Sequence, residues 1–172
     1  AGEADYQYHG ANRLGANSLL SCIYTGLMMG PGVNNYLKNL PEAASQLPSS
    51  VFENDEKRWK ERFSDISSMK GSENPYALHS ELAEAMISNV LIVRENDKLQ
   101  STLDVIEDIE SRWKDIECVD TQDWSNPVPS FVNQLWNMIQ LSKIITMGAL
   151  KRDEFRGSHY KPEFDLNQPD DF

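Results

Sequence analysis

The stretch SFVNQLWNMIQLSKIITMGALKR, residues 130–152, decides the fold class of this chain. Apolar residues recur in it at alternating steps of four and three, which is the spacing of helices that pack as coiled coils. The series consists of Phe131, Leu135, Met138, Ile145 and Ala149, and Ser142 is its one polar member. Further apolar residues widen the stripe, namely Trp136, Ile139, Leu141, Ile144 and Met147. We therefore expect a long helix that is buried on two sides.

Three more amphipathic stretches precede it, over residues 51–69, from Pro75 to about residue 90, and over residues 95–116. Asn74 precedes Pro75, and proline is favoured at the first position of a helix. The residues predicted to face a core are Phe52, Trp59, Phe63, Ile66, Leu78, Leu82, Met86, Val90, Leu99, Leu103, Ile106, Ile109, Trp113 and Ile116. Long amphipathic helices with short polar links predict a helical bundle, and no segment reads as a strand.

A further helix is predicted over residues 17–40. Asn17 or Ser18 is expected to cap it, and a break is expected near Pro31, which lies among glycines. Two prolines bracket the polar connector that follows, and a domain boundary is placed there. The predicted segments are 1–45, a helical bundle domain over 46–156, and an acidic tail over 157–172.

The composition excludes several functional classes. The formal charge of the 172-residue chain is −11, from 16 Lys and Arg against 27 Asp and Glu. That balance argues against nucleic acid and against anionic lipid as partners. The two cysteines are far apart, and His9, His79 and His159 share no metal-ligand spacing, so neither a disulfide scaffold nor a metal site is predicted. No apolar run reaches the length of a membrane span.

The loop HGANRLGANSLL, residues 9–20, is the first candidate for a binding site. Its glycines allow close approach of a ligand to the backbone, and Arg13 offers a charged fork that suits a carboxylate or a phosphate. Ser18 and Leu19 lie where the next helix presents unpaired N–H groups. The loop therefore reads either as an anion site or as a plain loop with Arg13 in a surface ion pair.

A second candidate is RGSHYKPEF, residues 156–164, which either reaches an active site or staples the tail to the bundle. His79 lies on a helix that is predicted to be mostly buried, where a structural role is commoner than a catalytic one. No serine occupies a nucleophile elbow, and neither cysteine is near a histidine in sequence. We therefore assign no catalytic residue within this chain.

Two motifs in order resemble the flavoproteins of succinate dehydrogenase and fumarate reductase. GEADYQYHGANRLGANSLLSCIYTG, residues 2–26, resembles the last FAD-contacting segment of that family. TQDWSNPVPSFVNQLWNMIQLSKIITMGAL, residues 121–150, followed by RGSHYKPEF, resembles the C-terminal helical domain of its bacterial members. The resemblance implies an all-α fold with a spectrin-repeat-like three-helix core, preceded by a helix of a truncated FAD-binding domain that ends near residue 45.

The resemblance also implies roles for individual residues. Glu3 is expected to bind the ribityl hydroxyls of FAD, and Arg13 to clamp one carboxylate of the dicarboxylate substrate. Ser18 and Leu19 are expected to contact the flavin ring from the helix N-terminus, where negative charge on the reduced flavin is stabilised. His9 is not expected to take the family's substrate-binding role, and the histidine and arginine of RGSHYKPEF are expected at a domain interface rather than in catalysis.

As a whole, the resemblance implies a fragment of a succinate dehydrogenase flavoprotein that oxidises succinate to fumarate. Its expected partners are an iron–sulfur subunit and membrane anchor subunits that pass electrons to quinone, with the protein peripheral on the cytoplasmic face of the inner or plasma membrane. Fumarate reductase and L-aspartate oxidase are the alternatives within the superfamily. A non-catalytic helical interaction module is the alternative of another class, and the fragment alone is expected to be inactive.

Overall fold

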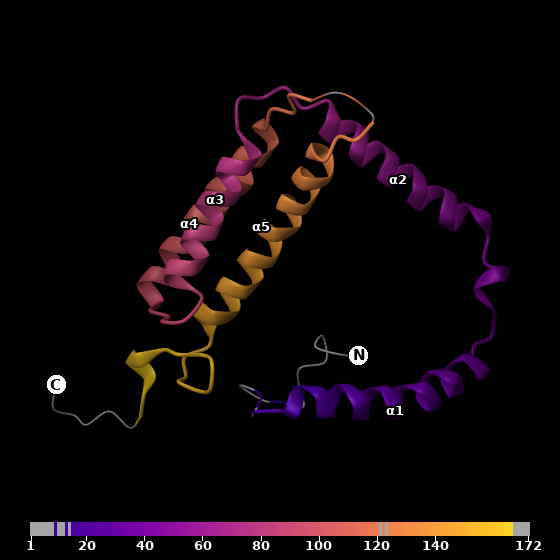
Figure 1. The fold of residues 1–172 in the computed structure, drawn as a ribbon, viewed down its shortest axis with the longest axis horizontal. Helices are drawn as coiled ribbons and strands as arrows, with labels where there is room; N and C mark the ends of the chain where they lie inside the picture. The colour runs from indigo at the N-terminus through magenta and orange to yellow at the C-terminus, as the bar shows by residue number, and fades with distance from the viewer. Residues whose placement is uncertain (1–8, 10–12, 14, 121, 123, 167–172) are drawn as a thin grey trace. The chain divides into compact units, whose positions relative to one another are not determined.

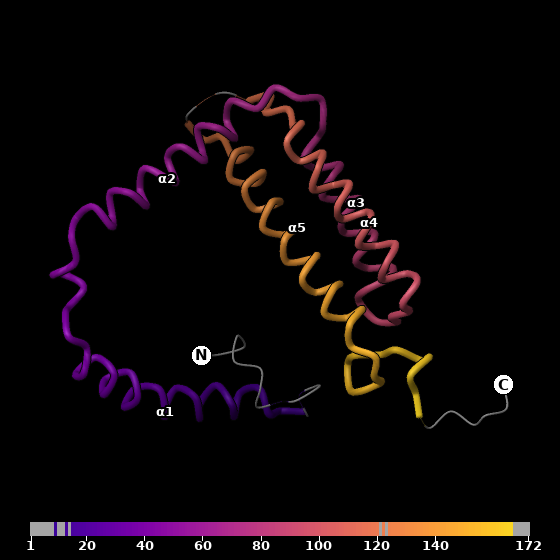
Figure 2. Tube along the Cα trace, turned by 180° about the vertical axis from the view of Figure 1, so that it is seen from behind, coloured from indigo at the N-terminus to yellow at the C-terminus, as the bar shows by residue number. Residues whose placement is uncertain are grey.

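A computed structural model describes residues 9, 13, 15–120, 122 and 124–166 of the chain, and its regular structure within them is helical (Figures 1 and 2). The five α-helices are α1 (Asn17–Lys38), α2 (Ser49–Ser67), α3 (Pro75–Asn89), α4 (Asn96–Arg112) and α5 (Val128–Lys151). Short 3-10 helices are η3 (Ala44–Gln46), η4 (Trp113–Asp115) and η5 (Pro162–Phe164). Pairing between extended segments in this part of the chain is limited to isolated bridges. The predicted all-α class is confirmed.

The chain divides into two compact units, Ala1–Asn54 and Asp55–Phe172. The first unit contains α1, and the second contains most of α2 and the helices α3 to α5. The domain limits predicted from the sequence, at residues 45 and 156, stay predictions.

Helices α3, α4 and α5 pack lengthwise against one another and form a three-helix bundle (Figures 1 and 2). Their apolar faces meet in one core, and Ile66 at the end of α2 joins it. The buried members are Ile66, Leu78, Leu82, Ile106, Ile109, Trp113, Ile116, Cys118, Val132, Leu135 and Ile139. A smaller cluster of Val90, Leu99 and Ala149 closes the other end of the bundle. Each of these side chains leaves water on folding, and this burial is the main source of the bundle's stability.

Helix α5 buries one face, whereas the sequence predicted burial on two sides. The buried series is Val132, Leu135, Ile139, Ser142, Thr146 and Ala149. Leu141 and Ile144 stay exposed at 59% and 66% of their surface. The steps still alternate between three and four, but the seam lies partly on other residues than predicted, because α3 and α4 cover only one side of the helix.

The start of α3 follows the prediction. Pro75 is its first residue, and the side chain of Asn74 accepts hydrogen bonds from the amide nitrogens of Tyr76, at 2.9 Å, and Ala77, at 3.4 Å. These bonds satisfy two of the amides that have no partner within the helix.

The loop that connects α2 to α3 is pinned to the end of α4. The amide of Gly71 donates to the carbonyl of Ile116 at 3.1 Å, and the amide of Glu73 donates to the carbonyl of Asp115 at 2.8 Å. A Cβ on Gly71 would lie 1.9 Å from the Asp115 carbonyl oxygen, so only glycine fits this approach.

The predicted apolar stripe of α2 is buried only at its end. Ile66 is 1% exposed, whereas Phe52, Trp59 and Phe63 are exposed at 57%, 41% and 37%. Ile66 joins the bundle core from the last turns of α2, whereas the apolar side chains of the earlier turns stay largely exposed.

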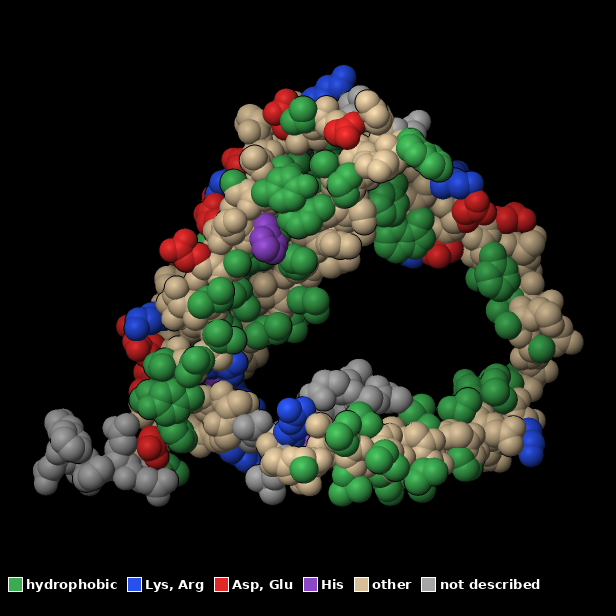
Figure 3. Space-filling model, viewed as in Figure 1, with side chains coloured by type: hydrophobic (Ala, Val, Ile, Leu, Met, Phe, Trp, Pro, Cys, Tyr) green, Lys and Arg blue, Asp and Glu red, His purple; other side chains and the backbone are tan. Residues whose placement is uncertain are grey.

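Helix α1 runs unbroken through Pro31, so the predicted break there is wrong. A proline removes one backbone hydrogen bond, and the turns on both sides of it keep theirs. Thr25 is the one residue of α1 that is buried. Its apolar side chains are exposed along the helix (Figure 3), and they include Leu19, Leu20, Ile23, Leu27, Met28, Tyr36 and Leu37.

Candidate functional site

The loop before α1 turns into the helix at Ala16. Ala16 has φ of 65° and ψ of −11°, in the left-handed region that residues with a Cβ rarely adopt. The helix begins at Asn17, so Asn17 and Ser18 lie inside its first turn. The prediction that one of them caps the helix is wrong, because the left-handed turn at Ala16 places both past the cap position.

His9 ties the loop to the helix. The hydroxyl of Ser21 donates its proton to the carbonyl of Ser18 at 2.9 Å, and Nε2 of His9 lies 3.1 Å from the same hydroxyl oxygen. Since that hydroxyl has already given its proton, Nε2–H of His9 is the donor in the second bond. His9 is therefore bonded to the second turn of α1.

Of the predicted binding residues, Ser18 and Leu19 lie in the first turn of α1, and Arg13 lies four residues before its start. Arg13 is exposed, and none of the described carboxylates pairs with it. Ser18 is half-buried and Leu19 is 73% exposed. Glu3 lies outside the described residues.

The electrostatics of this helix end suit an anion. Its first turn contains no acidic residue, and no described side chain caps its amides. The first amides of a helix have no partner within the helix, and they carry the positive end of its dipole. Together with the charged fork of Arg13, they can bind a carboxylate or a phosphate.

The second candidate motif packs onto the C-terminal end of α5. Gly157, with φ of 59°, forms a tight turn that pairs Arg156 with His159. His159 is 3% exposed, and its Nδ1 accepts a hydrogen bond from Nη1 of Arg94 at 2.7 Å. Because arginine only donates, the proton of the ring is on Nε2, which donates to the carbonyl of Arg152 at 2.7 Å.

The surroundings of His159 favour its neutral form. Burial lowers the pKa of His159 below its usual value of 6.5, and the positive charges of Arg94, Arg152 and Lys161 lower it further. The hydrogen bond to the Arg152 carbonyl acts in the opposite direction and favours the protonated ring. His159 is thus a neutral connector between α5 and the segment after α3.

Lys161 is fully buried, at 0% exposure. Its ammonium donates to the carbonyls of Leu150, at 3.1 Å, and Arg152, at 3.2 Å, and pairs with a carboxylate oxygen of Asp153 at 2.8 Å. It also lies 4.9 Å from the ring centre of Phe164. Carbonyls at the end of a helix lack partners within the helix, so Lys161 completes the C-terminus of α5. Of the two readings of RGSHYKPEF, the structure shows the staple.

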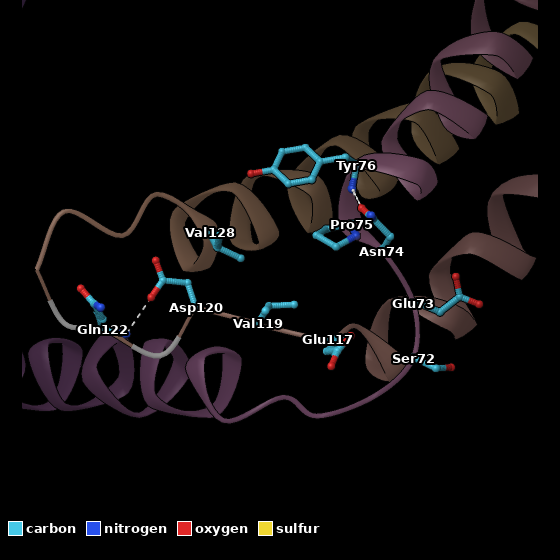
Figure 4. A pocket seen from close by; sticks show the side chains of 10 residues that line it. All are labelled: Ser72, Glu73, Asn74, Pro75, Tyr76, Glu117, Val119, Asp120, Gln122 and Val128. Atoms are coloured by element: carbon cyan, nitrogen blue, oxygen red, sulfur yellow. Dashed lines mark hydrogen bonds between the residues drawn. The ribbon is translucent and has the colours of Figure 1, made fainter.

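A pocket of about 470 Å³ opens where the loops at one end of the bundle meet (Figure 4). It is lined by Ser72, Glu73, Asn74, Pro75, Tyr76, Glu117, Val119, Asp120, Gln122 and Val128. One carboxylate of its wall is already neutralised, because Arg112 holds both oxygens of Glu73 at 3.0 and 3.1 Å. This pocket could not be predicted from the sequence, since its walls come from two loops that are more than 40 residues apart.

No group of three or more His, Cys, Asp or Glu residues in the described part of the chain is arranged to hold a metal ion. Within the same ranges, every helix is too short or too polar to cross a bilayer.

Comparison with known proteins identifies the family. A model of the C-terminal region of fumarate reductase flavoproteins matches residues 79–172, which is more than half of the chain. The chain belongs to the succinate dehydrogenase and fumarate reductase flavoproteins. In this chain, the matched residues cover α3 from His79 onward, α4, α5 and the staple.

The relatives of this chain include proteins named succinate dehydrogenase and proteins named fumarate reductase. The chain is 48% identical over 172 residues to the succinate dehydrogenase flavoprotein subunit of Bacillus subtilis, and covers 100% of itself and 29% of that protein. It is 29% identical over 167 residues to the 8-methylmenaquinol:fumarate reductase flavoprotein subunit of Wolinella succinogenes, covering 95% of itself and 26% of that protein. The chain thus spans less than a third of these relatives.

Solved structures of the family share the fold. A chain of the Mycobacterium smegmatis Sdh1 complex in the apo form matches with a TM-score of 0.76 at 29% identity, over 91% of this chain and 25% of that one. A quinol fumarate reductase of E. coli matches with a TM-score of 0.79 at 24% identity, over 95% of this chain and 27% of that one. At the identity of the second match, the likeness shows the fold alone.

Proposed function

We propose that this chain is the C-terminal part of a succinate dehydrogenase flavoprotein subunit, which oxidises succinate to fumarate with FAD. The observation that carries the proposal is the identity of 48% over all 172 residues to a protein of that name. It extends over the loop of residues 9–20 as well as over the helical bundle.

The start of α1 fits a flavin. Its first turn has no acidic residue, and no described side chain occupies its amides, so the positive helix end is open to a ligand that gains negative charge. Ser18 and Leu19 supply the amides that would hold the ring, and the exposed side chain of Leu19 offers an apolar contact. Bound FAD supplies the acceptor for the hydride. Glu3 is proposed to bind the ribityl chain.

Arg13 is proposed to hold one carboxylate of the dicarboxylate. It lies four residues before the start of α1, and none of the described carboxylates competes for its guanidinium. A bidentate arginine–carboxylate pair orients the ligand as well as binding it, and hydride transfer requires close alignment of the reacting atoms. The left-handed backbone of Ala16 sets the direction in which the loop that carries Arg13 leaves the helix.

The partners follow from the same proposal. Electrons pass from the flavoprotein to an iron–sulfur subunit and then, through membrane anchor subunits, to quinone. The protein is peripheral on the cytoplasmic face of the inner or plasma membrane. The 172 residues alone are inactive, because the matched relatives use more than twice as much additional chain. A yellow 172-residue chain that reduces a dye with succinate would contradict this part of the proposal.

Fumarate reductase is the second candidate within the family. It is favoured by relatives of that name, including the protein of Wolinella succinogenes and, at 32% identity, a CoM/CoB fumarate reductase protein of Methanothermobacter marburgensis. L-aspartate oxidase shares the HGANR loop, and a helical module without catalysis is the alternative of another class. Assays of the complete protein with succinate, fumarate and aspartate separate the four.

Arg13→Ala in the complete protein tests the proposed site. Loss of the carboxylate clamp should lower kcat/KM for succinate by about 100-fold or more, while FAD stays bound. The measurements are succinate-dependent dye reduction and the ratio of flavin to protein absorbance. Arg58→Ala is the matched control, since Arg58 is an exposed arginine paired with Asp55. Loss of flavin together with activity would make Arg13 structural, and unchanged turnover would exclude it from the site.

A further inference from the structure

A groove between α2 and α5 combines arginine and tryptophan side chains. It has a volume of about 350 Å³, and it is lined by Arg58, Trp59, Arg62, Trp136 and Asn137. The first three residues come from α2 and the last two from α5. Pockets of a few hundred Å³ with aromatic walls and a few polar groups are the usual form of small-molecule sites.

Arg62 lies in this groove, and no carboxylate in the described part of the chain serves as its counter-ion. The residue is half-buried, and its Nε donates to the side-chain oxygen of Asn133 at 2.6 Å. None of the described carboxylates lies within 4.0 Å of its guanidinium nitrogens, although Glu61 is its neighbour on α2, where it pairs with Lys57. A partly desolvated arginine with free terminal N–H groups attracts an anion. This is notable in a chain whose net charge is −11.

Indole rings supply the other half of the site. Trp59 is 41% exposed, and the Arg58 guanidinium carbon lies 5.7 Å from the centre of its ring. Trp136 is half-buried, and its position is fixed by Trp113, whose ring centre is 4.8 Å away. The indole N–H groups of Trp59 and Trp136 donate to no other described residue, so both are available to a ligand.

Arg62 itself is held in place by two contacts on the side of the bundle. Its Nε bond to Asn133 fixes one edge of the guanidinium, and its central carbon lies 5.9 Å from the ring centre of Trp113. An arginine that is already oriented loses less side-chain entropy when it binds a carboxylate. The groove is therefore preorganised at its charged end.

The geometry points to a binding site for a small aromatic carboxylate, with the carboxylate on Arg62 and the ring against Trp59 and Trp136. Such a ligand uses the free guanidinium N–H groups and the flat indole faces at the same time. An aliphatic acid uses only the first, and a cationic ring is repelled by the two arginines. This site shares no residue with the proposed flavin and dicarboxylate site, and it does not depend on that proposal.

Calorimetric titration of the complete protein tests the inference, with benzoate and indole-3-acetate as the probes. Malonate is kept saturating throughout, so that a dicarboxylate site is occupied. We expect a dissociation constant below about 1 mM for at least one probe, which is within the range for ligands of about ten heavy atoms. Cyclohexanecarboxylate, which lacks the flat ring, and benzamide, which lacks the charge, should each bind about tenfold more weakly or worse.

Variants assign the binding to the groove. Arg62→Gln should weaken the aromatic acid by about tenfold or more, and Trp59→Leu by about threefold to tenfold. Arg156→Gln is the matched control, because Arg156 is an exposed arginine at the other end of α5, and it should bind as the wild type does. Asn133→Ala removes the bond to Arg62 but leaves the guanidinium, so it should keep most of the affinity even if α2 becomes less stable.

Specific outcomes would overturn the inference. The first is that neither probe gives binding heat up to 10 mM, a limit of about tenfold above the expected dissociation constant. The second is that cyclohexanecarboxylate binds as tightly as the aromatic acids do. The third is that Arg62→Gln binds the aromatic acids with the affinity of the wild type. Circular dichroism of each variant verifies that it is folded. If Arg62→Gln is unfolded, Trp59→Leu decides, because the exposed Trp59 is not part of the buried core.

Discussion

Helices α1 and α5 are similar in length and in apolar content, and they differ in what covers them. Helix α1 has 22 residues and buries Thr25, whereas α5 has 24 residues and buries six of them. Leu27 in α1 is 71% exposed, and Leu135 in α5 is fully buried. An apolar helix gains stability only where other helices take its surface out of water, and α5 has α3 and α4 for that purpose.

The two helices also differ at their ends. The C-terminal carbonyls of α5 accept hydrogen bonds from Lys161 and His159, which the tail brings back to the bundle. The N-terminal amides of α1 have no capping side chain among the described residues. One helix end is closed by its own chain, whereas at the other end none of the described side chains caps the amides.

The largest expected effect is on the core of the bundle. Leu135→Ala removes buried methyl groups and leaves a cavity, so it should lower the free energy of unfolding of the second unit by about 2–5 kcal/mol. Leu27→Ala, the matched change on α1, should cost less than about 0.5 kcal/mol in the 172-residue chain. Urea denaturation followed by circular dichroism measures both. Equal losses would show that α1 is packed as well as α5, and the comparison would fail.

A smaller effect is expected for Arg112, which connects the helices of the bundle. Its guanidinium binds Glu73 from the loop before α3, Glu81 on α3, and Asp108 on α4. Arg112→Ala leaves three carboxylates unpaired and should cost about 1–3 kcal/mol, a value reduced by its partial exposure. Lys57→Ala breaks one exposed pair on α2 and should cost less than about 0.5 kcal/mol.

Thermal unfolding at two salt concentrations checks the origin of the Arg112 effect. Added salt screens exposed pairs more than partly buried ones, so the loss for Arg112→Ala should persist in 0.5 M salt (a Debye length of about 4 Å). A loss that vanishes in salt would mean that the connection contributes no more than a surface pair does.

The smallest expected effect is a pH dependence at the closed end of α5. The pKa of His159 is lowered in the folded state, chiefly by burial, so the unfolded chain takes up the proton first as the pH falls. The contribution of His159 is therefore complete above its usual pKa and is lost as the pH falls below it. His159→Gln keeps a donor and an acceptor but does not titrate. Between about pH 7.5 and 5.5, the Tm of the wild type should therefore fall by about 1–3 °C more than the Tm of His159→Gln does.

His79→Gln is the control for this pH profile, because His79 lies beside the ring of Phe131, 5.7 Å away between ring centres, rather than among cations. Its profile shows what the loss of a histidine elsewhere in the bundle does to the Tm. Identical profiles for His159→Gln and the wild type would show that His159 does not couple pH to the staple.

Local signals predicted the helices well. The pair Asn74-Pro75 marks the start of α3 because a side-chain cap and a proline at the first position act within four residues. The left-handed Ala16 was missed, since alanine is not expected at positive φ, and with it the cap position of α1, although the start of that helix at residue 17 was predicted. The continuity of α1 through Pro31 was missed because one lost hydrogen bond does not end a helix of 22 residues.

The candidate sites show the same difference between what local sequence signals predict and what depends on residues far apart in the chain. Arg13 and the loop around it could be proposed as a candidate site from the sequence, because glycines, an arginine and a helix start lie within twelve residues. Arg62 was not found, because its partner Asn133 is 71 residues away. Lys161 was predicted only as part of a tail, and nothing in its neighbours along the sequence indicates that its ammonium is buried.

The sequence by itself determined that the chain is helical, where most of its helices lie, and to which family its motifs belong, because periodicity, caps and motifs act over short stretches. Only the tertiary structure decided which face of α5 is buried. The predicted and the observed seam share Leu135, Ser142 and Ala149. In the observed seam, Val132 and Ile139 are buried at the places where Phe131 and Met138 were predicted. A helix with apolar residues around most of its circumference carries no preference of its own, and the helices that pack against it make the choice.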